Sequence, residues 1–205
     1  MPEGYAKFRC SWAKEPIDVP AAPLAALGRW RGELRSRDLL GATTDGVGFG
    51  NLSVRLGMRG FLITGSATGA LERLEPRHYA LVDETRPEEN WLSCRGMTCA
   101  SSESLTHAAV YGTLAWANGV IHVHSARMWQ RYVNRLPTTP GEAEYGTPEM
   151  ARAIASLAGL ASLASGSASA AVLVMGGHRD GLIGFGADLD AAGAVLLKLY
   201  RAEAG

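Results

Sequence analysis

Two pairs of short apolar runs, each joined by a glycine-containing turn, limit most strongly what this chain can fold into. Residues 52–55 alternate apolar and polar side chains, and residues 61–63 follow a turn at Gly57–Gly60. In the second pair, residues 171–175 and 182–185 flank the loop Gly-Gly-His-Arg-Asp-Gly. Runs of this length on either side of a tight turn predict β-hairpins. Because the strands come mainly as hairpins, a mixed or antiparallel sheet covered by helices fits better than a doubly wound parallel sheet.

Segments with helical spacing separate these strands. Gly41 is expected to stop the first helix, and Ser101-Ser102 is expected to cap the start of the second. Residues 79–82 and 120–124 are expected to form further short strands. The expected helices cover Pro23 to Leu39 or Leu40, residues 103–116, Thr147-Pro148 to about Leu160, and Asp188 to about Ala202.

The length of 205 residues suits one domain with a sizeable core. Residues 1–20 contain three prolines and no sustained period, so we expect an irregular lead-in followed by a single domain over residues 21–205. Residues 161–170 are rich in alanine and serine and are expected to form a low-complexity loop.

The charge balance of the chain argues against several classes of protein. There are 20 Lys and Arg residues against 20 Asp and Glu residues, so the formal net charge is zero. A nucleic-acid-binding protein is therefore not expected. The apolar runs are far shorter than the roughly 20 residues of a membrane helix, which argues against a membrane protein. The three cysteines form no C-x-x-C pair, which favours a reducing, cytoplasmic environment over a disulfide framework.

The sharpest chemical feature is His122-Val123-His124 on an expected strand. Positions i and i+2 of a strand point to the same face, so the two imidazoles converge while Val123 points into the core. His178 lies in the glycine-flanked hairpin loop, where a surface histidine explains it equally well when it is taken alone. Three histidines together favour a site for Zn²⁺, Fe²⁺ or Mn²⁺, because zinc enzymes commonly use three protein ligands and leave one position open. A purely structural role for the strand pair stays open at this point.

Glu103 follows Ser101-Ser102 at the expected start of a helix. Helix capping explains the serines without any function, and the helix dipole explains the carboxylate. A functional interpretation is also open, because the amides and hydroxyls at a helix start bind anions and a neighbouring carboxylate can move protons. His107, one turn further along, and His78 are interpreted as structural.

Other catalytic motifs are absent or out of place. The glycine-rich segment Gly46–Asn51 follows a helix and enters a strand, which is the reverse of the order in a dinucleotide-binding loop. The sequence has neither a P-loop motif nor the G-x-S-x-G elbow of serine hydrolases. The three cysteines lack a convincing partner for a thiol nucleophile.

Six short blocks occur along the chain: GFGNLSVR (48–55), FLITGSATG (61–69), SSESLTHAAVY (101–111), VIHVHS (120–125), YGTPEM (145–150) and GGHRDGLIGFGADLDAA (176–192). Taken in this order, they resemble the class II aldolase/adducin-head family over roughly residues 24–200. The resemblance implies a three-layer α/β/α fold with a mixed, largely antiparallel central sheet. It also implies a homotetramer with active sites near the subunit interfaces. Sugar-phosphate aldolases, a pentulose-phosphate epimerase, a dehydratase and the non-catalytic adducin head belong to this family.

Matched by position, the resemblance assigns the family's metal ligands and its acid/base residue. His122, His124 and His178 match the three metal-binding histidines. Glu103 matches the carboxylate that acts as acid and base and that ligates the metal when substrate is absent. The implied cofactor is a divalent metal, Zn²⁺ first, with Mn²⁺, Fe²⁺ or Co²⁺ as alternatives.

The resemblance also assigns contacts to the substrate's phosphate. Gly50-Asn51 and Ser101-Ser102 match two of these contacts. The family's Thr-Gly pair falls near Thr68-Gly69, and an extra residue in this loop leaves Ser66 as a competitor. The chain departs from the sugar-phosphate aldolases after the histidine strand, because fewer residues separate His124 from Tyr145 than is expected of those enzymes. In those enzymes the missing part carries an aromatic proton donor.

These features together imply a metal-dependent lyase of the aldolase type in carbohydrate metabolism. Its expected substrate is a small hydroxy-carbonyl compound, a sugar phosphate, processed through a metal-stabilised enediolate. An epimerase or a dehydratase of the same family is an alternative, because both reactions can start from the same stabilised carbanion. A non-catalytic, adducin-like interaction module is the alternative from a different class of function.

Overall fold

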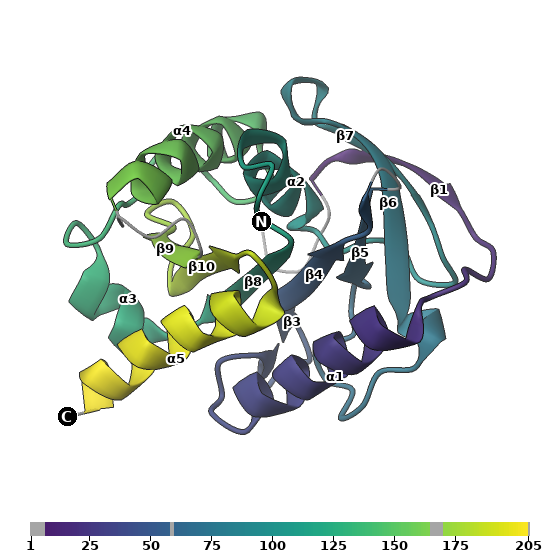
Figure 1. Ribbon diagram of the computed structural model, residues 1–205, viewed down its shortest axis with the longest axis horizontal. Helices are drawn as coiled ribbons and strands as arrows, with labels where there is room; N and C mark the ends of the chain where they lie inside the picture. The colour runs from purple at the N-terminus through teal and green to yellow at the C-terminus, as the bar shows by residue number, and fades with distance from the viewer. Residues whose placement is uncertain (1–6, 58–59, 165–169, 205) are drawn as a thin grey trace.

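An eight-stranded mixed sheet forms the centre of the computed structural model, which describes residues 7–57, 60–164 and 170–204 (Figure 1). Its strand order is β1-β7-β6-β5-β4-β8-β10-β9, and all neighbours pair antiparallel except β1 and β7. The predicted mixed, largely antiparallel sheet is confirmed. The strands are β1 (Arg9–Ala13), β4 (Asn51–Arg55), β5 (Phe61–Thr64), β6 (Tyr79–Arg86), β7 (Trp91–Arg95), β8 (Gly119–His124), β9 (Ala170–Val174) and β10 (Gly181–Gly186), with β2 (Gly41–Ala42) and β3 (Gly48–Phe49) as a separate two-stranded sheet.

Helices cover both faces of the sheet, so the predicted three-layer α/β/α architecture is confirmed. Helices α2 and α4 pack together on one face, while α1, α3 and α5 lie on the other (Figure 1). None of the helices in the described part of the chain combines the length and the apolar character that crossing a bilayer requires. The helices are α1 (Ala21–Arg35), α2 (Ser104–Thr113), α3 (Ala126–Tyr132), α4 (Pro148–Ala164) and α5 (Leu189–Ala204), with short 3₁₀ turns η2 (Pro76–His78) and η3 (Pro87–Glu89).

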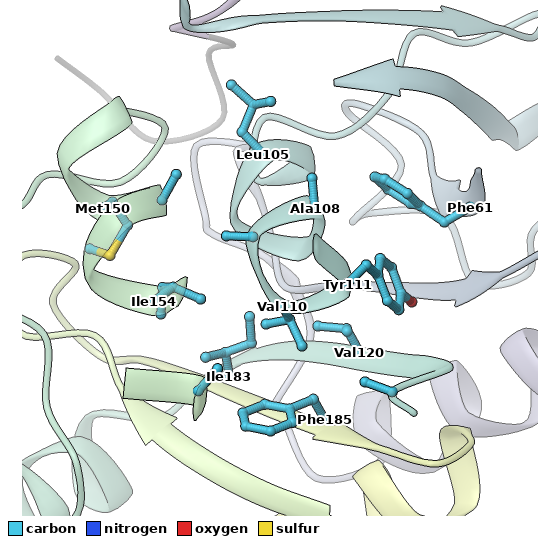
Figure 2. Close-up of a cluster of buried hydrophobic side chains, with 14 of the residues drawn as sticks. Phe61, Leu105, Ala108, Val110, Tyr111, Val120, Met150, Ile154, Ile183 and Phe185 are labelled. Atoms are coloured by element: carbon cyan, nitrogen blue, oxygen red, sulfur yellow. The ribbon is translucent and has the colours of Figure 1, made fainter. Parts of the chain in front are cut away.

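Each face of the sheet has its own apolar core. Figure 2 shows the core under α2 and α4, where Val110 from α2 and Ile154 from α4 lie close to Ile183 from the sheet. The second core joins α1 and α5 to the opposite face through residues such as Leu34 and Leu196. Strand β8 contributes to both cores because its side chains alternate between the two faces. Val120 packs into the first core, and Ile121 and Val123 pack into the second.

The prediction of an irregular segment over residues 1–20 is wrong for Arg9–Ala13, which form β1. This strand pairs parallel with β7 at one edge of the sheet. Most of its side chains are exposed, so it lacks the apolar alternation that marks a half-buried strand. The wider division into a lead-in and one domain over residues 21–205 stays a prediction.

The first helix ends earlier than its apolar spacing predicts. Helix α1 stops at Arg35, and Asp38 takes the left-handed conformation, with φ of 55°. The Asp38 amide donates to the Arg35 carbonyl and the Leu39 amide donates to the Leu34 carbonyl, a Schellman arrangement. The stop is therefore made by an aspartate, and the expected stop residue, Gly41, lies in β2 instead.

Two further boundaries differ from expectation. Strand β6 continues past a bulge after Val82 and ends at Arg86, because β7 supplies pairing partners there. Helix α4 runs to Ala164, into the expected loop, since alanine and leucine are strong helix formers. The rest of that expected loop, residues 165–169, lies outside the described residues. The predicted hairpins β4–β5 and β9–β10 are confirmed.

Helix α2 begins without the serine cap that the sequence predicts. Glu103 occupies the N-cap position and makes no side-chain cap hydrogen bond. The Ser101 hydroxyl lies 3.5 Å from the Glu103 amide, and the Ser104 hydroxyl turns back to donate to the Ser101 carbonyl at 2.6 Å. Ser101-Ser102 therefore precedes the helix as part of a turn.

A pair of identical substitutions tests the central core. Leu52 on β4 is fully buried in the core under α1 and α5, whereas Leu160 on α4 is 59% exposed. We expect Leu52→Ala to lower the free energy of unfolding by about 2–5 kcal/mol, because it leaves a cavity. Leu160→Ala is expected to change it by less than about 0.5 kcal/mol. Urea denaturation followed by circular dichroism measures both, and equal effects would contradict this packing.

Candidate metal centre

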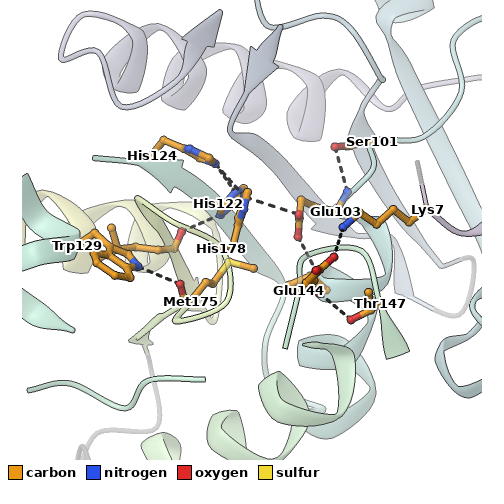
Figure 3. Close-up of polar contacts among 12 residues, drawn as sticks. Lys7, Ser101, Glu103, His122, His124, Trp129, Glu144, Thr147, Met175 and His178 are labelled. Carbon is orange, nitrogen blue, oxygen red and sulfur yellow. Dashed lines mark hydrogen bonds and ion pairs between the residues drawn. The ribbon is translucent and has the colours of Figure 1, made fainter. Parts of the chain in front are cut away.

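Three histidine side chains from two parts of the chain meet beside β8 (Figure 3). His122 and His124 lie two residues apart on β8, and His178 lies in the turn between β9 and β10. The Nε2 atom of His124 is 3.0 Å from the Nε2 atom of His122 and 3.0 Å from that of His178. The structure therefore brings together the three histidines that the sequence singles out.

A backbone hydrogen bond orients the first of these rings. The Nδ1–H group of His122 donates to the carbonyl oxygen of Leu182 at 3.0 Å. A carbonyl can only accept, so the proton of the neutral ring is on Nδ1 and the Nε2 lone pair points to the shared centre. Metal-ligating histidines are held in this way by a second hydrogen bond from the other ring nitrogen.

Burial keeps the three rings neutral. His122 is 1% exposed and His178 is 5% exposed. Loss of solvation lowers the pKa of His122 to about 4 and lowers the pKa of His124 well below its usual value. The pKa of His178 is also lowered, chiefly by burial and then by the charges of the other two histidines and Lys7. At neutral pH all three imidazoles can therefore offer lone pairs.

The spacing of the three nitrogens fits a metal ion. Nitrogen ligands that share a tetrahedral zinc ion at 2.0–2.1 Å lie about 3.3 Å apart. The two Nε2 separations of 3.0 Å at this cluster are close to that value. Imidazole ligands with a carboxylate nearby suit zinc and other first-row divalent ions.

Glu103 stands beside this cluster at the start of α2. Its side chain is 3% exposed, and its Oε2 atom accepts a hydrogen bond from the Thr106 hydroxyl at 2.7 Å. Its Oε1 atom lies 3.9 Å from the Nε2 atom of His178 (Figure 3). The carboxylate is therefore fixed on one side and presented to the histidines on the other.

The hairpin turn that carries His178 depends on close backbone approach. A Cβ atom on Gly177 would lie 1.9 Å from the Ala143 carbonyl oxygen. A Cβ atom on Gly181 would lie 2.8 Å from Cδ2 of the His178 ring. On the other side, the Trp129 indole donates to the Met175 carbonyl at 2.9 Å, which ties α3 to the start of the turn. The glycines around His178 are thus required by space, as the sequence indicates.

A second, polar hollow adjoins the histidines. The first hollow is lined by the three histidines together with Glu103 and Tyr145, and it shares Gly48, Gly50, Asn51 and Ser102 with the second. Within the second one, no lining residue carries a charge, so the hollow offers backbone amides and neutral side chains to a ligand. It contains every residue that the resemblance assigns to phosphate contacts: Gly50, Asn51, Ser66, Thr68, Gly69, Ser101 and Ser102.

The loop over residues 65–69 is held tightly against its neighbours. The Thr68 hydroxyl donates to the Gly65 carbonyl at 2.8 Å, and the Ser66 amide donates to the Cys99 carbonyl at 2.8 Å. A Cβ atom on Gly69 would lie 2.5 Å from Cα of Gly48. The Thr68 hydroxyl is therefore engaged within its own loop, and both Ser66 and Thr68 line the hollow.

Three residues near the histidines were not singled out by the sequence. The Phe49 ring lies 5.5 Å from the His124 ring, and the Tyr145 ring lies 4.7 Å from the His178 ring. The Lys7 ammonium lies 4.1 Å from the centre of the Tyr145 ring. Phe49 and Tyr145 lie within two of the sequence blocks quoted above, so the resemblance could have identified them. Lys7 lies in the expected lead-in, where no sequence pattern marks it.

The two histidines interpreted as structural lie outside the cluster. His107 on α2 is fully buried, and its Nδ1 atom lies 2.7 Å from the Ser53 hydroxyl. His78 is half-buried and accepts a hydrogen bond from the Glu75 amide at 2.9 Å, as part of a capping box.

Comparison with known proteins identifies similar sequences and folds. The family model of the class II aldolase and adducin N-terminal domain matches residues 35–202. L-fuculose-1-phosphate aldolase from Thermus thermophilus is 22% identical, with a TM-score of 0.61 over 89% of this chain and 91% of that one. YgbL from Klebsiella pneumoniae, described as "a putative aldolase/epimerase/decarboxylase", is 20% identical, with a TM-score of 0.66 over 89% of this chain and 86% of that one. A sugar-phosphate aldolase from Thermotoga maritima is 15% identical, with a TM-score of 0.64 over 89% and 92% of the two chains. No curated protein sequence matches the chain.

Removing one imidazole tests the metal centre. We expect His178→Ala to weaken binding of Zn²⁺ about 100-fold or more, because two protein ligands remain where three are needed. His78→Ala is the matched control, since it removes a half-buried histidine outside the cluster and should leave binding unchanged. Titration calorimetry and metal analysis of the purified chain give the result, and equal affinity in both variants would rule out the centre.

The lowered histidine pKa values predict how stability depends on pH. In the metal-free protein, the unfolded chain takes up a proton on His122 near pH 6.5, and the folded chain does so only near pH 4. The free energy of unfolding should therefore fall as the pH drops from 6.5 to 4, by up to about 1.4 kcal/mol per pH unit for this group.

Urea unfolding of the chelator-treated protein at a series of pH values measures this slope. Other groups also titrate in the acid range, so the comparison is with His122→Gln, in which the contribution of this imidazole is missing and the slope is shallower. Identical slopes for the two proteins would show that His122 is not buried in its neutral form.

Proposed function

Because the chain belongs to the class II aldolase and adducin N-terminal domain family, we propose that it is a metal-dependent lyase of the aldolase type. Its substrate is a small hydroxy-carbonyl compound, and a sugar phosphate fits best. One observation carries this: Glu103 lies 3.9 Å from a cluster of three converging histidines that opens into a polar hollow. The proposed acid/base group, the metal ligands and the anion contacts thus lie next to one another.

His122, His124 and His178 would hold the metal, and Glu103 would join them as a ligand when no substrate is bound. Zn²⁺ is the first choice, with Mn²⁺, Fe²⁺ and Co²⁺ as alternatives, because neutral imidazoles bind all four. When bound, such an ion would act as a Lewis acid and polarise a nearby carbonyl group of the substrate.

Glu103 is the proposed catalytic acid and base. In aldol cleavage, the bond between the carbon next to the carbonyl and the carbinol carbon breaks, and its electron pair stays on the former. The carbinol hydroxyl loses its proton as an aldehyde forms, and the carbon that keeps the electron pair receives a proton. The Thr106 hydroxyl holds one oxygen of Glu103, so the other can deliver or remove that proton at a constant position.

The second hollow is the proposed site for the substrate's phosphate. Its lining has hydroxyls and backbone amides but no lysine or arginine among the described residues. Neutral donors that converge on one point can hold a phosphate without a formal positive charge. Asn51 and Ser102 line both hollows, so they would stand between the phosphate and the reacting carbons. The other proposed contacts are Gly50, Ser66, Thr68, Gly69 and Ser101.

A second candidate is a different reaction of the same metal-stabilised type. The similar YgbL structure is described as that of a putative aldolase/epimerase/decarboxylase, which supports epimerisation as an alternative reaction. Epimerisation and dehydration can begin with the same proton or carbon-bond step but release no aldehyde. An adducin-like interaction module would bind metal without turnover.

We further propose a homotetramer with active sites near the subunit interfaces, as the family resemblance implies. A cytoplasmic location is also proposed, because three free thiols suit a reducing compartment.

The test is a cleavage assay with L-fuculose 1-phosphate and other ketose 1-phosphates, after loading the chain with Zn²⁺ or Mn²⁺. We expect release of a triose phosphate and an aldehyde. Glu103→Gln should lower kcat by about 10²–10⁴-fold, because proton transfer is lost while the shape of the side chain is kept. Glu142→Gln, which makes the same change at an exposed position, should leave kcat unchanged.

Stereochemical inversion or loss of water without cleavage would instead support the epimerase or dehydratase reaction. Metal binding with no turnover of any substrate in the panel would favour the interaction module. Full activity of Glu103→Gln would remove this carboxylate from the mechanism.

A further inference from the structure

Three cysteine side chains come together at the edge of the sheet, away from the histidines. Cys10 lies on β1, Cys94 lies on β7, and Cys99 follows β7 in the chain. The Cys10 sulfur is 3.5 Å from the Cys94 sulfur and 3.7 Å from the Cys99 sulfur, and all three lie within 4.8 Å of one another. Strand β7 is separated from β8 by three intervening strands, so this cluster is not part of the histidine centre.

The strand register makes a disulfide between the two strand cysteines a poor fit. Cys10 pairs with Leu92, which is two residues before Cys94. A step of two residues along a strand and one step across the sheet place the two Cα atoms about 8 Å apart. Disulfides span about 4.4–6.8 Å between Cα atoms, so this pair would need the edge strand to shift.

The same sulfur separations match a shared metal ion. Thiolates that bind one tetrahedral Zn²⁺ at about 2.3 Å lie about 3.8 Å from each other. The observed separations of 3.5 and 3.7 Å are within a few tenths of an ångström of this value. Two of the three sulfur–sulfur separations therefore already match those around a zinc ion, and the third is no more than 4.8 Å.

The surroundings of the cluster suit such an ion. Cys94 is 1% exposed and packs in the core under α2 and α4, so this side of the site is shielded from water. Cys10 and Cys99 are half-buried, so one side stays open for the ion to enter and for water as a fourth ligand.

We propose that Cys10, Cys94 and Cys99 form a second metal site, a three-thiolate centre for Zn²⁺. Binding forms three zinc–sulfur bonds and releases the thiol protons to solvent, with no change of oxidation state. The ion would fasten β1 to the chain segment that follows Cys99. The Cys99 carbonyl accepts a hydrogen bond from the Ser66 amide, so the fastened segment also supports the loop of the polar hollow.

The test uses the full chain, stripped with chelator under reducing conditions and reloaded with Zn²⁺ alone or with Co²⁺ alone. We expect two ions per chain and, with Co²⁺, the near-ultraviolet charge-transfer absorption of cobalt–thiolate bonds, which imidazole ligands do not produce. Cys99→Ser should reduce the stoichiometry from two ions to one and weaken this absorption. His178→Ala should keep the absorption, which separates failure of this site from failure of the histidine centre.

A measurement on the unmutated chain keeps the test decisive if a cysteine variant does not fold. Zn²⁺ should slow the reaction of the thiols with a disulfide reagent about tenfold or more, because bound thiolates are shielded. An unchanged rate, a cobalt complex without charge-transfer absorption, or two ions retained in Cys99→Ser would overturn the second site. Formation of a Cys10–Cys94 disulfide in the presence of Zn²⁺ would do the same.

Discussion

The mutual approach of three neutral imidazoles is the constraint on which the rest of the site depends. Burial removes water from His122 and His178 and keeps the rings uncharged, while the Leu182 carbonyl turns one lone pair inward. The Nε2 atom of His124 lies 3.0 Å from the Nε2 atoms of both other rings, a separation at which the three rings can share one cation. The protein can maintain this arrangement because β8 lies inside the sheet, paired on both sides by β4 and β10. Val123, between two of the ligands, is fully buried in the opposite core and fixes the rotation of the strand.

The remaining parts of the site come from the ends of elements rather than their interiors. Glu103 stands at the start of α2, His178 at a hairpin turn, and the polar hollow at the ends of β3 and β5. Element ends bring backbone amides and short polar side chains to the surface of the fold, where they can bind an anion. The sheet and the two cores then act as a frame that keeps these ends in register with one another. The small separation between the histidines and the hollow, which share Asn51 and Ser102, is set by this frame.

Patterns that repeat along the chain could be predicted from the sequence, and contacts between distant segments could not. The β4–β5 and β9–β10 hairpins were predictable because two apolar runs and the glycine turn between them lie within one short stretch of the chain. The strand β1 was not, because an exposed edge strand has no apolar alternation and its partner β7 is about eighty residues away. For the same reason the cysteines, which show no motif spacing, come together only through that parallel pairing. The convergence of His178 with the β8 histidines could be inferred from resemblance, but the positions of Lys7 and Tyr145 around it required coordinates.

The five residues from Cys99 to Glu103 connect these separate features within a single short segment. The segment starts at the thiol cluster, pairs Ala100 with Gly65 in an isolated bridge, lines the polar hollow with Ser101-Ser102, and ends at the carboxylate. Five residues have little freedom to absorb a displacement when both ends are held by contacts elsewhere. The position of Glu103 relative to the histidines is therefore set from the edge of the sheet as well as from α2. A change in how β1 docks on β7 would reach the carboxylate through this segment, although β1 itself supplies none of the residues proposed to meet the substrate.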